Sequence, residues 1–68
     1  MNLWDVTDYE GDRFVVNIDT ICDIYVDGDS PWLTNIGLMN GDVITLDMKM
    51  SGVLETLRGI LNERYARY

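Results

Sequence analysis

Turn-forming residues recur about every ten residues between residues 9 and 41, and this spacing constrains the fold more than any other sequence feature. Such spacing is typical of an antiparallel meander of short strands. The strongest signal is Asn40-Gly41, which predicts a two-residue hairpin turn with positive φ at both positions. The apolar and β-branched runs between turns predict five strands, at Leu3–Thr7, Arg13–Asn17, Ile21–Val26, Trp32–Leu38 and Val43–Leu46.

The hydrophobic period changes after Met50. Val53, Leu57 and Ile60 recur at the three- and four-residue spacing of one helical stripe, and Ser51 is a natural N-cap. We therefore expect an amphipathic helix over about residues 52–66. The predicted fold class is α+β, with an antiparallel β-meander of about five short strands within residues 3–47 and one C-terminal helix, in a single domain spanning 1–68.

The chain contains one cysteine, Cys22, and no histidine. These counts exclude an intrachain disulfide and a zinc site of the usual Cys/His kind, and they remove the commonest catalytic base. Alternation predicts that Cys22 shares an apolar face with Ile24 and Val26, so we expect an inert core thiol. We predict no enzyme, no cofactor and no metal site. Because a chain of this length buries only about 60% of its unfolded surface, we expect a homo-oligomer.

The sequence also indicates where in the cell the protein is located. No apolar run approaches the ~20 residues of a membrane-spanning helix. There is no Asn-x-Ser/Thr acceptor and no basic, apolar leader, and the lone thiol fits a reducing environment. These features predict a cytoplasmic protein with no membrane span.

Negative charge is concentrated in the predicted strands. Residues 1–47 hold ten acids and one arginine, a net of −9, whereas residues 48–68 hold four bases and two acids, a net of +2, which together give −7. This balance argues against direct binding of duplex DNA, which requires Lys and Arg to neutralise phosphates. The ten carboxylates form either a solubilising surface or a mimic of a nucleic-acid backbone, which could bind a protein partner with a basic surface. The predicted partner-binding residues lie on and after the third strand: Asp23, Tyr25, Asp27, Asp29 and Trp32.

The acidic loop Asp27-Gly28-Asp29-Ser30 superficially resembles a calcium-binding loop. Pro31 and Trp32 occupy the positions where an EF-hand would supply further oxygen ligands and a glycine. We therefore interpret this loop as a solvated turn.

The C-terminal segment interleaves arginines with tyrosines, a mixture that can stack on a base and hold its phosphate. The candidate nucleotide-binding residues are Arg58, Arg64, Tyr65, Arg67 and Tyr68. The alternative is a helix end whose tyrosines cover the sheet while its arginines interact with the helix dipole and nearby acids.

Aromatic side chains are numerous for such a small surface. One helix cannot bury all of Trp4, Tyr9, Tyr25 and Trp32, so we expect some of them to be exposed. Exposed aromatics on a sheet with open edges favour an interface with a partner or with a second copy.

Several short motifs carry a family resemblance. They are Val6-Thr7 and Gly11, then Phe14-Val15-Val16-Asn17 with Asp19 and Ile21, then Ile36-Gly37-Leu38 with Asn40-Gly41, and finally Ser51 with Val53-Leu54. Over roughly residues 3–61 the chain resembles the FlbD family of small bacterial proteins, which are encoded among flagellar genes and act as motility accessories. The resemblance implies no catalytic residue.

Two functional hypotheses follow. In the first, the chain is a non-enzymatic small acidic binding protein, an inhibitor of the kind phages and mobile elements carry. It would block or sequester a host defence protein or the nucleotide or nucleic-acid ligand of that protein. The alternative is a FlbD-like motility accessory that binds a flagellar component.

Overall fold

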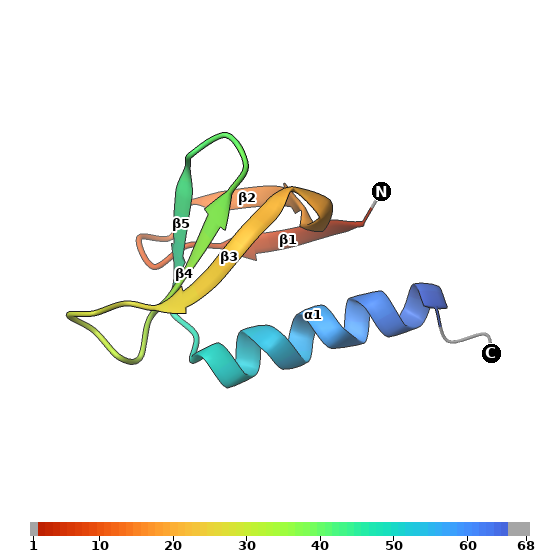
Figure 1. The fold of residues 1–68 in the computed structure, drawn as a ribbon. Coiled ribbons are helices and arrows are strands. Elements are labelled where there is room, and N and C mark those ends of the chain that lie inside the picture. The colour runs from red at the N-terminus through yellow and green to blue at the C-terminus, as the bar shows by residue number, and fades with distance from the viewer. Residues whose placement is uncertain (1, 66–68) are drawn as a thin grey trace.

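The computed structural model describes the backbone of residues 2–65 and the side chains of residues 2–61. It has five antiparallel strands and a C-terminal helix, which confirms the predicted α+β class (Figure 1). The strands form a two-stranded sheet, β1-β2, and a three-stranded sheet, β3-β4-β5. In chain order the elements are β1 (Leu3–Thr7), β2 (Arg13–Asn17), the 3-10 helix η1 (Ile18–Thr20), β3 (Ile21–Val26), β4 (Thr34–Leu38), β5 (Val43–Leu46) and α1 (Met50–Tyr65).

The β4–β5 hairpin is present as predicted, but the predicted turn type is wrong. Leu38 N–H donates to Asp42 O (2.9 Å), so three residues form the loop, and among the described residues only Gly11 and Gly41 have positive φ (94° and 92°). Asn40 therefore keeps a negative φ, and Gly41 alone takes the left-handed position of a three-residue loop. The β1–β2 turn repeats this pattern, with Asp8 N–H donating to Asp12 O (2.8 Å) and Gly11 at positive φ.

The two sheets share one core with the helix. Trp4, Val6 and Val16 from the hairpin meet Ile36, Ile44 and Leu46 from the second sheet, and Val53 and Leu57 cover them from α1. The helix begins at Met50, two residues earlier than predicted, so Ser51 lies inside the first turn and is not the N-cap. Among the described residues, no helix is long and apolar enough to cross a membrane.

Backbone hydrogen bonds join the β1–β2 turn and η1 to the second sheet. Tyr9 N–H, in the β1–β2 turn, donates to Thr45 O of β5 (2.9 Å). Met39 N–H, in the β4–β5 loop, donates to Thr20 O of η1 (2.9 Å). These bonds fix the free edge of β2 relative to β4 and β5.

Strand β3 departs from simple alternation, and this overturns the predicted position of Cys22. Ile21 pairs with Leu38 and Asp23 pairs with the adjacent Gly37, so Cys22 is the extra residue of a β-bulge. The bulge places Ile21 and Ile24 against the core and leaves Cys22 exposed. The prediction of a core thiol facing the same way as Ile24 was therefore wrong.

Candidate functional site

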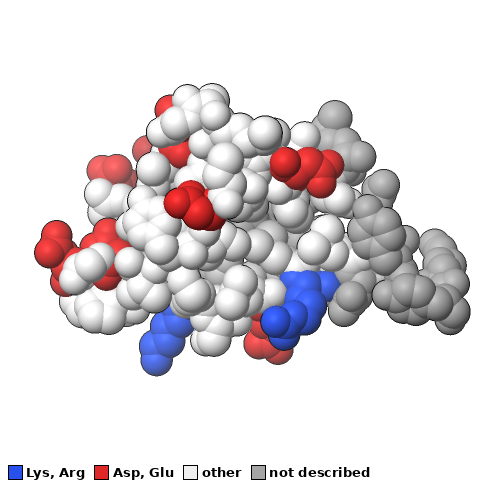
Figure 2. Space-filling view, viewed as in Figure 1, with Lys and Arg blue, Asp and Glu red and all other residues white. Residues whose placement is uncertain are grey.

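Of the charged side chains visible in Figure 2, those over the strand half are acidic, whereas the basic ones lie on the helix side, beside one acidic group. Among residues whose side chains are described, the one ion pair joins Arg13 to Asp5 across β1 and β2, with both side chains at least half exposed. The two bonds are bidentate, at 3.0 Å from Nε and 2.5 Å from Nη2. The hydrogen bond from Arg13 lowers the pKa of Asp5. The remaining strand-region carboxylates have no cationic partner within the described part of the chain.

Asp27, a predicted partner-binding residue, uses its carboxylate inside the protein. Oδ1 accepts hydrogen bonds from the backbone N–H groups of Asp29 (3.0 Å) and Ser30 (3.2 Å). Oδ2 accepts from Nδ2 of the buried Asn35 (3.2 Å), whose Oδ1 accepts in turn from the Thr45 hydroxyl (2.6 Å). The bond from Asp29 N–H, followed by that from Asn35, lowers the pKa of Asp27. Asp27 thus organises the β3–β4 loop and anchors it to the sheet.

The other predicted partner-binding residues are exposed. Asp23 and Tyr25 point outward from β3, opposite Gly37 and Asn35 of β4. The Asp23 carboxylate lies directly over Gly37, where the Cβ of any larger residue would collide with its Oδ1. Asp29 and Trp32 lie in the loop between β3 and β4. Trp32 was predicted to begin the fourth strand, but β4 begins at Thr34.

The aromatic residues divide as expected. Trp4 is buried in the core, whereas Tyr9, Tyr25 and Trp32 keep 55%, 41% and 58% of their surface exposed. The prediction that one helix cannot bury them all is confirmed.

The candidate nucleotide-binding residues are only partly described. Arg58 is exposed on α1. The side chains of Arg64 and Tyr65, and the whole of Arg67 and Tyr68, lie outside the described part of the structure. A nucleotide site at this end of the helix stays a prediction.

The sequence reasoning did not single out a cluster of carboxylates at the β1–β2 turn. Ligand atoms of Asp8, Glu10 and Asp12 lie within 4.8 Å of one another. Oδ1 of Asp8 accepts the backbone N–H groups of Glu10 (3.0 Å) and Asp12 (2.8 Å), as expected for an aspartate that stabilises a turn. Turn geometry therefore accounts for this cluster.

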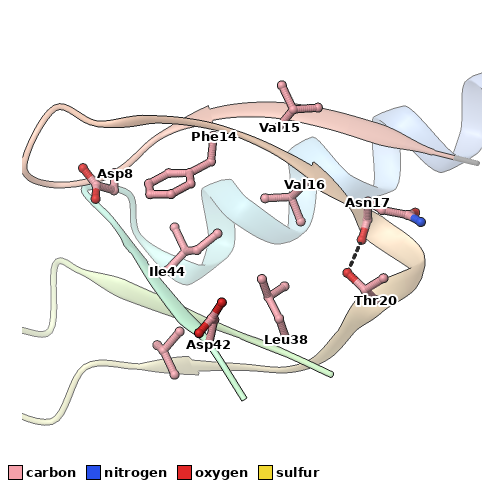
Figure 3. A pocket seen from close by; sticks show the side chains of 10 residues that line it. Asp8, Phe14, Val15, Val16, Asn17, Thr20, Leu38, Asp42 and Ile44 are labelled. Atoms are coloured by element: carbon pink, nitrogen blue, oxygen red, sulfur yellow. Dashed lines mark hydrogen bonds between the residues drawn. The ribbon is translucent and has the colours of Figure 1, made fainter. Parts of the chain in front are cut away.

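The structure also contains a groove that sequence reasoning missed. It has a volume of about 430 Å³ and opens between β2 and the β4–β5 hairpin. Phe14, Val16, Leu38 and Ile44 point into it, with Asp8 and Asp42 at its margin (Figure 3). The only sequence signal for it was the unusually apolar β2, where Phe14, Val15 and Val16 are consecutive.

Comparisons with known proteins add no relative: no family model, curated protein or solved structure matches this chain. The resemblance to the FlbD family accordingly stays a hypothesis that depends on the turn and core motifs of the sequence.

Proposed function

We propose that this protein is a non-enzymatic inhibitor that binds a basic surface of a partner protein through its acidic strand region. The form of this function that we favour is the one predicted from the sequence: a phage- or mobile-element-encoded protein that blocks or sequesters a host defence protein. Its contact residues are those exposed on and after β3, namely Asp23, Tyr25, Asp29 and Trp32.

The observation that carries this proposal is the lack of internal neutralisation. Across the residues with described side chains, only Asp5 of the ten strand-region acids is in an ion pair. Carboxylates packed over one half of a small protein repel one another, and this repulsion disfavours the folded state. A partner with a basic surface would relieve that repulsion and would be steered towards the protein by long-range attraction.

Exposed aromatics beside these carboxylates support the same interpretation. Protein interfaces are enriched in Tyr and Trp, which supply contact area at their centres. Tyr25 follows Asp23 by two residues on β3, and Trp32 follows Asp29 by three residues in the next loop. Charge would set the rate of encounter with the partner, and the aromatic side chains would slow its dissociation.

The test uses charge reversal at two of the exposed contact residues. Asp23→Lys/Asp29→Lys alters exposed carboxylates and leaves Asp27, which holds the loop together, intact. The control is Asp47→Lys/Glu55→Lys, which makes the same change in net charge at exposed positions away from β3, one directly after β5 and one on α1. Each protein is expressed in bacteria that carry a defence system, and plaque formation by a susceptible phage is counted.

We expect the wild type and the control to restore plaques on at least one defended host and the Asp23/Asp29 variant to lose this effect. The defence protein recovered with the wild type should dissociate as salt rises from about 0.1 to 1 M, over which the Debye length falls from about 10 to 3 Å. The proposal would be contradicted if the wild type restored plaques on none of the defended hosts tested. Binding of the defence protein that is insensitive to salt would also contradict it.

A further inference from the structure

The groove between β2 and the β4–β5 hairpin is bordered by two free strand edges. Within the described part of the chain, strand β2 pairs only with β1, and β5 pairs only with β4. In an antiparallel pair, opposite residues alternate between those that exchange backbone hydrogen bonds and those whose polar groups point away from the partner strand. The register therefore decides which backbone groups border the groove.

On β2 these groups belong to Val15. Asp8 and Asp12 form a bonded pair, since Asp8 N–H donates to Asp12 O (2.8 Å). Counting along the register makes Val6 and Phe14 a bonded pair and makes Asp5 and Val15 a non-bonded pair. The N–H and C=O of Val15 consequently point to the free edge of β2.

On β5 the equivalent residue is Val43. Leu38 N–H donates to Asp42 O (2.9 Å), so the next pair, Gly37 and Val43, is non-bonded. The polar backbone groups of Val43 thus point away from β4. Thr45, two residues further along β5, directs its backbone groups to the same edge as Val43. Its carbonyl accepts the hydrogen bond from Tyr9 N–H, as expected for a group that points away from β4.

The floor of the groove is an incompletely covered part of the core. Phe14 and Val16 point from β2 towards Ile44 and Leu38, whereas Val15 points away from the groove (Figure 3). Phe14 keeps 40% of its surface exposed, although it lies on the same face of β2 as the buried Val16, and Val43 keeps 52%. A volume of about 430 Å³ lies within the roughly 300–1,000 Å³ range of ligand-binding pockets.

We propose that this groove binds an extended segment of a partner protein, which adds a strand to the free edge of β2 by hydrogen bonding to Val15. Alternate apolar side chains of that segment would pack against Phe14 and Ile44. This arrangement follows from strand geometry, because every second side chain of an added strand projects to the same side as Phe14 and Val16.

Charge identifies the kind of segment. Among the residues that the structure describes, the groove lining includes two carboxylates, Asp8 and Asp42, and no lysine or arginine. A segment that carries a lysine or arginine at its ends is therefore complementary to the groove. A second copy of this chain is disfavoured as the occupant, because it would bring a strand region of net charge −9 to the same carboxylates. The inference is independent of the proposed inhibitor function, since none of its contact residues lines the groove.

The test uses a synthetic probe, the blocked peptide Lys-Val-Thr-Val-Thr-Val-Lys, and a control peptide with glutamate at both ends. Binding is followed by chemical-shift changes in the backbone amides of the isotope-labelled protein. We expect the lysine peptide to shift the amides of Val15, Asn17 and Val43 and to slow hydrogen exchange at Val15 N–H. The glutamate peptide should bind at least about tenfold more weakly, because it brings like charges together.

A matched pair of variants tests backbone pairing. Val15→Pro removes an N–H that β1 does not use, and proline is tolerated where the N–H of an edge strand faces solvent. Val15→Thr keeps the N–H and the β-branched shape. We expect the proline variant to bind about tenfold more weakly, the effect of one lost hydrogen bond, and the threonine variant to bind like the wild type.

Four results would overturn the inference. The first is that about 1 mM lysine peptide leaves the chemical shifts of the groove amides unchanged. The second and third are that both peptides bind equally well, or that the proline and threonine variants bind the lysine peptide equally well. The fourth is that the chemical shifts of the groove amides depend on protein concentration when no peptide is present. The last would show that a second copy occupies the groove. If the proline variant does not fold, exchange at Val15 N–H in the wild type decides: unchanged exchange with bound peptide refutes pairing to β2.

Discussion

Thr34 makes a buried hydrogen bond whose contribution to stability can be isolated. The Thr34 side chain is fully buried, and its hydroxyl donates to the carbonyl of Met48 (2.7 Å) in the segment that leads from β5 into α1. The bond therefore links the start of β4 to the start of the helix. Thr34→Val replaces the hydroxyl with a methyl group of similar size and leaves the Met48 carbonyl without this donor.

An unsatisfied polar group in a protein interior costs about 1–3 kcal/mol, and we expect Thr34→Val to lower the free energy of unfolding by about 2 kcal/mol. Thr34→Ser keeps the hydroxyl and deletes one methyl group, which costs about 1 kcal/mol. Because a domain this small has only about 3–5 kcal/mol of stability from its core, the valine change removes a large fraction of it.

The assay is urea unfolding followed by tryptophan fluorescence, with Trp32→Phe in every protein so that the buried Trp4 is the only reporter. With a slope of about 1 kcal/mol per molar urea, the valine variant should unfold about 2 M earlier than its parent and the serine variant about 1 M earlier. A valine variant as stable as its parent would refute the reasoning, because it would show that the Met48 carbonyl needs no partner.

Three further predictions concern a thiol, a carboxylate and the helix. Cys22 should react with a disulfide reagent in the native protein as fast as in urea, since the bulge exposes it; a protected thiol would contradict the register of β3. The pKa of Asp27, measured by carboxyl NMR, should lie below the usual ~3.9. The stability that Asp27 contributes should therefore be complete at neutral pH and be lost as the pH falls below about 4, and a normal pKa would exclude this contribution. Leu57→Ala should lower the free energy of unfolding by about 2–5 kcal/mol in the same urea assay, and a change below about 1 kcal/mol would show that α1 is not packed on the sheet.

The sequence predicted the elements well because the signals for them are local. Turn residues and apolar periods act within a few neighbours, so strand and helix positions are predicted to within two residues at most ends. The bulge at Cys22 depends on how β3 pairs with β4, which is not a local property. A usable signal was nevertheless present, because Ile21 and Ile24 are three residues apart and both can face the core only if one residue is extra.

The roles of individual acids could be predicted only in part, for the same reason. Asp27 precedes Gly28 and Ser30, a pattern that favours a side chain bonded to the backbone two residues on. Its second partner, Asn35, lies on the next strand and became evident only from the fold. The groove could not be predicted from the sequence, because it is formed by β2 and the β4–β5 hairpin, which are distant in the chain.

The turns also show which negative charges the fold requires. Asp8, Asn17, Asp27 and Asn40 each accept a hydrogen bond from the backbone N–H two residues on, so an amide serves this purpose as well as a carboxylate. Asp8 uses only Oδ1, whereas Asp27 uses both oxygens and needs two acceptors. Asp27→Asn should therefore destabilise the protein more than Asp8→Asn, and the reverse order would refute this assignment. If Asp8→Asn folds normally, the negative charge of Asp8 is not required to stabilise the turn. Such a charge at the margin of the groove is expected for a residue that faces a basic partner.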